Sequence, residues 1–159
     1  MIFMTAKRKT ALILTWGFVL FCMALIFHFS HQNASDSSET SSGLIKEIFY
    51  FFKIELSSHF IRKTAHAIEF GGLCFAFNLA YCATFLKFSP FVSLASTVFY
   101  ASTDELHQYF IEGRACQLRD IFVDFCGAVL VTAAITVLYL IYKSYKEKRG
   151  VKNVSFKTV

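Results

Sequence analysis

Residues 101–120 combine acids, arginines and a histidine directly after an uncharged apolar stretch. The segment reads ASTDELHQYFIEGRACQLRD, and the chain just before it includes FVSLASTVF, which carries no charge. Its ionisable residues are Asp104, Glu105, His107, Glu112, Arg114, Arg119 and Asp120. Carboxylates and imidazoles can transfer protons, and arginine guanidinium groups grip phosphate bidentately. The segment is therefore either the solvated edge of an apolar helix or part of a site.

Other polar residues recur at helical spacing. Lys63, His66 and Glu69 follow one another at steps of three, so they share one face of a helix. Two further pairs stand four residues apart, namely Asp104 with Gln108 and Asp120 with Asp124. These spacings predict that each helix directs its polar side chains to one side.

The elements that must position these residues are membrane helices. Of the 159 residues 55% are hydrophobic, 20 are Phe and the mean hydropathy is +0.50, which exceeds the usual composition of a soluble domain. A span needs about 20 apolar residues. Four segments satisfy this length, and they predict an all-α, polytopic membrane protein with spans at about 11–29, 64–86, 89–110 and 121–142.

Two segments outside the spans are distinguished by their composition, one amphipathic and one basic. LIKEIFYFFKIEL, at about 44–56, is too short and too charged to span, and its apolar residues at steps of four predict an amphipathic helix in the membrane interface. We divide the chain into a membrane domain, 1–142, and a basic tail, 143–159. The five cysteines form no CxxC pair and predict neither a disulfide framework nor a thiolate metal site.

The distribution of Lys and Arg predicts the orientation. The N-terminal segment, the loop at Lys87 and the C-terminal tail carry ten of the sixteen Lys and Arg residues, and the opposite side carries six. Loops rich in Lys and Arg stay in the cytoplasm. We therefore expect a multi-pass plasma-membrane protein with both termini cytoplasmic.

With that topology, the acids of three spans lie at one depth. Glu69, Asp104, Glu105 and Asp124 all fall in the outer half of the bilayer, about one or two turns below the surface. A charge near mid-membrane costs about 2.5–3.5 kcal/mol on insertion scales, so these side chains should turn inward. We expect a basic rim above them, formed by Arg62, Lys63, Arg114 and Arg119.

A structural interpretation competes with the functional one. Ion pairs between helices could simply fix the register of the bundle, although desolvation often cancels their Coulomb gain. Small residues predict where the backbones approach closely, at Gly71 and Gly72 in the second span and at Gly127 with Ala128 in the fourth.

Four motifs in order resemble the VanZ-like family of small bacterial membrane proteins, over about residues 11–142. They are FSHQ, RKTAHAIEFGGL, STDELHQYFIEGR and LRDIFVDFCGA. The resemblance adds Ser30 and Gln32 to the candidate residues, and it also covers Lys63, His66, Glu69, Asp104, Glu105, Gln108, Gly113, Arg114, Asp120, Asp124 and Gly127. Two positions depart from the family pattern: Glu112 replaces a common proline, and Phe70 replaces a frequent Tyr.

The resemblance and the residues together lead to three hypotheses about function. The family's namesake is associated with teicoplanin resistance, so the first is binding of an envelope lipid, a wall precursor or a glycopeptide, linked to glycopeptide resistance. Its binding residues would be Ser30, Gln32, Arg62, Lys63, Gln108, Arg114, Arg119, Asp120 and Asp124.

The second hypothesis is an enzyme that acts on a phosphate-bearing envelope lipid. Its candidate catalytic residues are His66, Glu69, Asp104 and Glu105, and with His107 the same side chains could instead hold a divalent cation. The third is a transporter or channel subunit. No cofactor and no metal site is assigned, and the expected partners are membrane lipids rather than nucleic acid.

Overall fold

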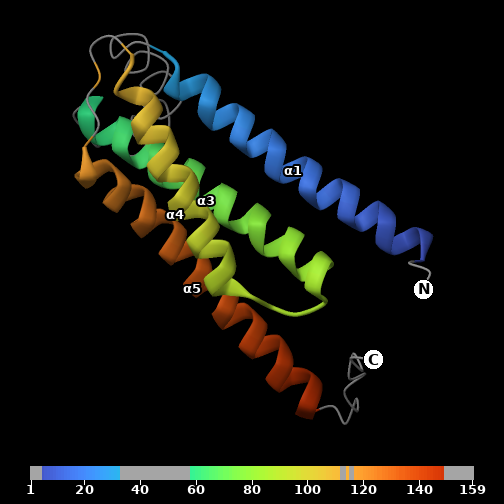
Figure 1. The fold of residues 1–159 in the computed structure, drawn as a ribbon. Coiled ribbons are helices and arrows are strands. Elements are labelled where there is room, and N and C mark those ends of the chain that lie inside the picture. Colours follow the sequence, from blue (N-terminus) through green and yellow to red (C-terminus); the bar gives the residue numbers. More distant parts are fainter. Residues whose placement is uncertain (1–4, 33–57, 112–113, 115–116, 149–159) are drawn as a thin grey trace, which may run out of the picture.

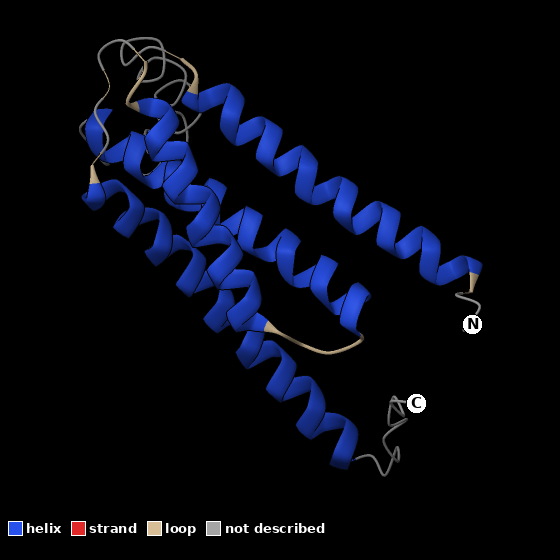
Figure 2. Cartoon of the chain, in the orientation of Figure 1, coloured by secondary structure: helices blue, strands red, loops and turns tan. Residues whose placement is uncertain are grey.

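The computed structural model describes residues 5–32, 58–111, 114 and 117–148. These residues form helices α1 (Ala6–Ser30), α3 (Ser58–Phe85), α4 (Pro90–Gln108) and α5 (Leu118–Lys148), as Figure 1 and Figure 2 show. The described part of the chain contains no strand, so the all-α class is confirmed. The expected interfacial helix at 44–56, the end of the basic tail and Gly113 lie outside the described residues.

Three helices are long and apolar enough to cross a membrane. They are α1, α3 over Phe60–Phe85, and α5. Helix α4 is not among them, because its 19 residues include several hydroxyls and end in the sequence DELHQ. By length and composition the described helices are compatible with a multi-pass membrane protein, with three candidate spans among them.

Helix α3 is the centre of the bundle, because α1, α4 and α5 all pack against it. Its closest approach is to α5, where a Cβ built on Gly127 would lie only 2.8 Å from the Cα of Ala67. A Cβ on Gly71 would lie 3.0 Å from a methyl carbon of Val131, whereas Gly72 is exposed and has open space beside it. The predicted close packing holds for Gly71 and Gly127 and is wrong for Gly72, which lies on an exposed face of α3.

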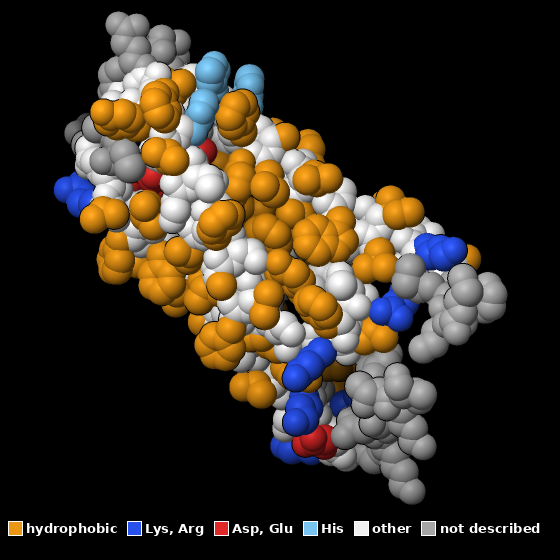
Figure 3. Space-filling view, in the orientation of Figure 1, with side chains coloured by type: hydrophobic (Ala, Val, Ile, Leu, Met, Phe, Trp, Pro, Cys, Tyr) orange, Lys and Arg blue, Asp and Glu red, His pale blue; other side chains and the backbone are white. Residues whose placement is uncertain are grey.

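The outer surface of the described helices is apolar, and their interior combines an apolar core with buried ionisable side chains. Large apolar side chains cover the visible face in Figure 3, and Leu14, Phe91 and Leu130 are each more than 60% exposed. Asp104, Glu105, Gln108 and Asp124 are at most 4% exposed. Apolar side chains outside and ionisable side chains inside are what a lipid environment requires.

The two ends of the bundle differ in charge. Lys and Arg gather at the end where α1 begins and α5 ends (Figure 3). At that end Nη2 of Arg8 donates to the carbonyl oxygen of Thr84 at 3.0 Å, and Nε1 of Trp16 donates to its hydroxyl at 3.1 Å. These bonds tie the start of α1 to the end of α3. We call the opposite end, where α1 and α4 end and α3 and α5 begin, the distal end.

Candidate functional site

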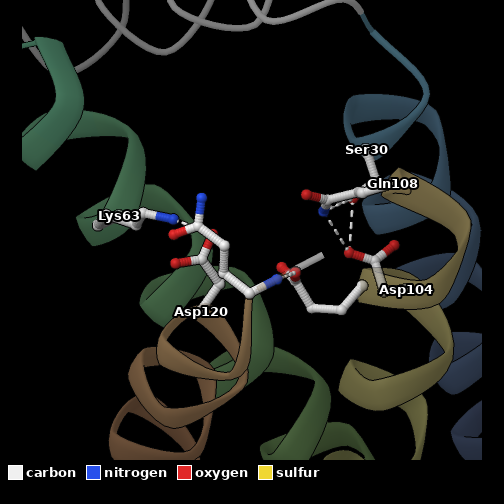
Figure 4. Close-up of polar contacts among 7 residues, drawn as sticks. Ser30, Lys63, Asp104, Gln108 and Asp120 are labelled. Atoms are coloured by element: carbon white, nitrogen blue, oxygen red, sulfur yellow. Dashed lines mark hydrogen bonds and ion pairs between the residues drawn. The ribbon is translucent and has the colours of Figure 1, made fainter. Parts of the chain in front are cut away.

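A buried cluster at the distal end joins α1 to α4. The hydroxyl of Ser30 donates to Oδ2 of Asp104 at 2.8 Å. Nε2 of Gln108 donates to the same oxygen at 2.8 Å and to the Ser30 hydroxyl at 3.2 Å. Figure 4 shows the three side chains turned toward one another. The spacing of four between Asp104 and Gln108 makes this possible, because both lie on one face of α4.

A second group of contacts links α3, α5 and the chain between α4 and α5. Lys63 of α3 forms an ion pair with Asp120 in the first turn of α5 (Figure 4). The backbone N–H of Gln117 donates to Oε2 of Glu105 at 3.0 Å. The carboxylate of Glu105 therefore fixes the chain just before α5. Sequence reasoning did not select Gln117, because a backbone donor leaves no signal in residue type.

Between these groups lies a small polar pocket with a net positive lining and a volume of about 110 Å³. It is lined by Arg62, Lys63, His66, Gln108, Arg114, Gln117 and Asp120. Three of these side chains are permanently or normally cationic, and only Asp120 is acidic. Such a lining suits an anion with several oxygen atoms, since guanidinium and ammonium groups supply charge-assisted donors.

Arg114 enters this pocket from the chain between α4 and α5. Its Nη2 donates to the carbonyl oxygen of Phe29 at 3.3 Å, while its buried Nε has no partner among the described residues. Burial lowers the pKa of the Arg114 guanidinium from its usual value, and the nearby Arg62 adds to the decrease. Arginine nevertheless stays charged in proteins, so an incoming anion would meet a guanidinium with donors to spare.

The acids expected at one depth differ in burial and in their hydrogen-bond partners. Asp104, Glu105 and Asp124 are buried, whereas Glu69 is half-buried. Glu69 lies within electrostatic range of Asp104 and Arg114. Oδ1 of Asp124 has no hydrogen-bond partner in the described part of the chain. Most of this layer thus faces the bundle interior.

The remaining candidates divide between the pocket and the surface. His66 lines the pocket, and its ring lies parallel to that of Phe70, with 6.4 Å between centroids. Oε1 of Gln32 is buried without a partner among the described residues. Arg119 is exposed and does not line the pocket, so the structure does not bring it to the site.

The divalent-cation site expected from His66, Glu69, Asp104, Glu105 and His107 finds no geometric support. Within residues 5–32, 58–111, 114 and 117–148, no three His, Cys, Asp or Glu side chains are placed to hold one ion. The proposed set that included His66, Glu69 and His107 is therefore not assembled.

The fold and the site define a multi-pass helical membrane protein with a polar centre at one end of the bundle. The family model described as VanZ/LLP1 matches residues 15–142. This match spans most of the chain, and the protein belongs to the VanZ-like family, as its motifs indicate. No curated protein and no solved structure is similar enough to match it.

Proposed function

We propose that this VanZ-like protein binds the phosphate headgroup of an envelope lipid in the distal pocket. The observation that carries the proposal is the pocket lining, in which Arg62, Lys63 and Arg114 face a single acid, Asp120. Arginine forks bind phosphate oxygens in pairs, and a lysine adds a point charge. The guanidinium groups of Arg62 and Arg114 would supply the donors to the headgroup, because both N–H groups of Gln108 are already bonded to Asp104 and Ser30.

The proposed topology puts this pocket on the outer face. The Lys and Arg residues gathered near both termini favour a cytoplasmic location for that end of the bundle. We take α4 as a fourth span, because 19 residues extend about 28 Å, close to the thickness of the hydrocarbon core. The distal pocket would then open at the outer surface of the plasma membrane, where wall precursor lipids and glycopeptides meet.

This location connects the proposal to antibiotic resistance. The family's namesake is associated with teicoplanin resistance, and a protein that holds a wall precursor lipid or another phosphate-bearing lipid could alter the access of a glycopeptide to its target. Binding alone is sufficient for this effect, and it requires no bond chemistry. The ligand class is therefore a lipid with a phosphate group near the outer surface.

A membrane enzyme is a second candidate, and the position of His66 favours it. Its imidazole lines the same pocket as the cationic side chains, where it could transfer a proton to or from a bound phosphate ester. His66→Ala should then abolish turnover of a phosphate-bearing lipid while the lipid is still retained. Unchanged lipid after incubation with the wild-type protein would leave binding as the function.

Native mass spectrometry of the full chain, purified from membranes in mild detergent, tests the binding proposal. We expect co-purified lipids that carry phosphate, and we expect Arg114→Gln to reduce the lipid-bound fraction. A charge-assisted hydrogen bond contributes about 1.5–3 kcal/mol, which corresponds to a loss of about tenfold or more. Arg119→Gln is the matched control, since Arg119 is exposed and outside the pocket. Equal lipid retention by both variants would refute the proposed site.

A further inference from the structure

Two histidines from different helices meet at the distal end, outside the cationic pocket. His31 is the residue directly after α1, and His107 lies in the last turn of α4. Nδ1 of His31 is 3.3 Å from Nε2 of His107, in an exposed position. Histidine side chains gather at this end of the face that Figure 3 shows. Neither histidine lines the pocket assigned to the headgroup.

We propose that His31 and His107 form a binding site for a borderline transition-metal cation such as Zn²⁺, Cu²⁺ or Ni²⁺. Zn–N bonds of about 2.0–2.1 Å at tetrahedral angles place two ligating nitrogens about 3.3–3.4 Å apart. The separation between the two imidazole nitrogens equals this value. Without a metal ion, the same separation lets the N–H of one imidazole donate to the ring nitrogen of the other.

The arrangement of the rings suits a shared ion. The planes of the two imidazoles differ by only 17°, with 5.4 Å between centroids, so the rings are nearly parallel and bring one nitrogen of each within 3.3 Å of the other. The ring of Phe27 lies 4.7 Å from that of His107 and 5.9 Å from that of His31, and it supports both from one side. Two facing ring nitrogens leave the remaining coordination positions of a shared ion to water.

The chemistry around the pair selects the kind of cation. Two imidazole nitrogens suit zinc, copper and nickel, whereas magnesium and calcium prefer oxygen ligands. The carboxylate of Asp104 lies within electrostatic range of His107, which favours a cation at this position. Oδ2 of Asp104 is held by Ser30 and Gln108, so the carboxylate acts through its charge rather than as a ligand.

A metal ion at this pair would also link two weakly connected helices. Helix α1 packs mainly on α3 and meets α4 over few residues. The ion would join the last turn of α4 to the residue that follows α1, next to the cluster of Ser30, Asp104 and Gln108. Metal binding would therefore stabilise the contact between α1 and α4 at the distal end.

Metal titration of the full-length protein, purified without a polyhistidine tag, tests this site. We expect one Cu²⁺ per chain, with nitrogen couplings in its electron paramagnetic resonance spectrum, and competition by Zn²⁺ but not by Mg²⁺. Even changes outside the ligand shell cost metal sites about 10–100-fold, so His31→Ala and His107→Ala should each weaken binding by at least about tenfold. His28→Ala is the control and should bind as the wild type.

Size-exclusion chromatography verifies that each variant is folded. If His107→Ala does not fold, His31→Ala still decides, because His31 is exposed and lies beyond the helix end. Wild-type affinity in His31→Ala, absence of nitrogen coupling in the wild-type spectrum, or loss of binding in His28→Ala would each overturn the proposal. Lys63→Ala should leave metal binding unchanged, which separates this site from the headgroup pocket.

Discussion

The hydroxyl of Ser30 donates a 2.8 Å hydrogen bond to Oδ2 of Asp104 and thereby connects the last residue of α1 to the buried face of α4. Ser30 is fully buried and Asp104 is 4% exposed. Gln108 donates to the same carboxylate oxygen. Asp104 is therefore stabilised by one donor from α1 and one from α4. Because Ser30 and Asp104 belong to different helices, their hydrogen bond also holds α1 and α4 together at this end.

Loss of the Ser30 hydroxyl should weaken the bundle. Ser30→Ala removes one of the two donors to Oδ2 of Asp104, and leaving a buried polar group undersatisfied costs about 1–3 kcal/mol. We expect a lower midpoint of thermal unfolding in detergent, followed by circular dichroism. Ser102→Ala is the control, because the Ser102 hydroxyl is exposed and bonds only to its own helix, at Val98. Equal midpoints for the two variants would contradict the structural role of Ser30.

The contact between α3 and α5 should not tolerate a side chain at Gly127. A Cβ there would collide with the backbone of Ala67, which cannot move without separating the two helices. Gly127→Val should therefore prevent accumulation of folded protein, as measured by fluorescence-detected size exclusion. Gly72→Val provides the comparison on the exposed side of α3, where nothing lies within 4 Å. A monodisperse Gly127→Val protein would show that the helices pack differently.

Asp120 should oppose anion binding while it pairs with Lys63. It is the single acid among the pocket-lining residues, and its ion pair with Lys63 occupies a cation that a phosphate could use. Asp120→Asn keeps the shape of the side chain and removes its charge. We expect the variant to retain more phosphate-bearing lipid than the wild type in native mass spectra. Weaker retention would mean that Asp120 is needed to position Lys63.

Asp124 should tolerate neutralisation. It is 2% exposed, and its Oδ1 has no hydrogen-bond partner among the described residues, so its charged form would carry a large desolvation cost. Asp124→Asn should therefore leave the thermal midpoint unchanged or raise it. Asp124→Lys, which places a cation at the same buried position, should lower it strongly. A large loss with Asn would show that the carboxylate charge itself stabilises the fold.

Much of the architecture could be predicted from the sequence because apolar length is a strong signal. The long apolar runs indicate helices α1 and α5 directly, and the family motifs mark the residues that gather at the distal end. The status of α4 as a span does not follow from hydropathy, because hydroxyls and the acids at its end reduce the apolar signal. Gly72 was misassigned because adjacent residues on a helix point about 100° apart, so only Gly71 faces α5.

The details of the site depend on contacts that residue types do not encode. The charge of Arg119 predicts a position in the basic rim, yet its place at the start of α5 leaves it exposed. The backbone donor of Gln117 and the meeting of His31 with His107 depend on how α1, α4 and α5 end or begin. Such relationships join residues far apart in the chain, and a single sequence contains no measure of their distance.

The central claim is that the distal pocket recognises a phosphate group, and lipid selectivity tests it most directly. Delipidated protein should be titrated in native mass spectrometry with phosphatidylglycerol and with diacylglycerol of the same acyl chains. Recognition by Arg62, Lys63 and Arg114 predicts that the phosphate-bearing lipid is retained at least about tenfold more strongly, since each charge-assisted contact contributes about 1.5–3 kcal/mol. Equal retention of the two lipids would contradict the claim, because binding would then depend on the acyl chains alone.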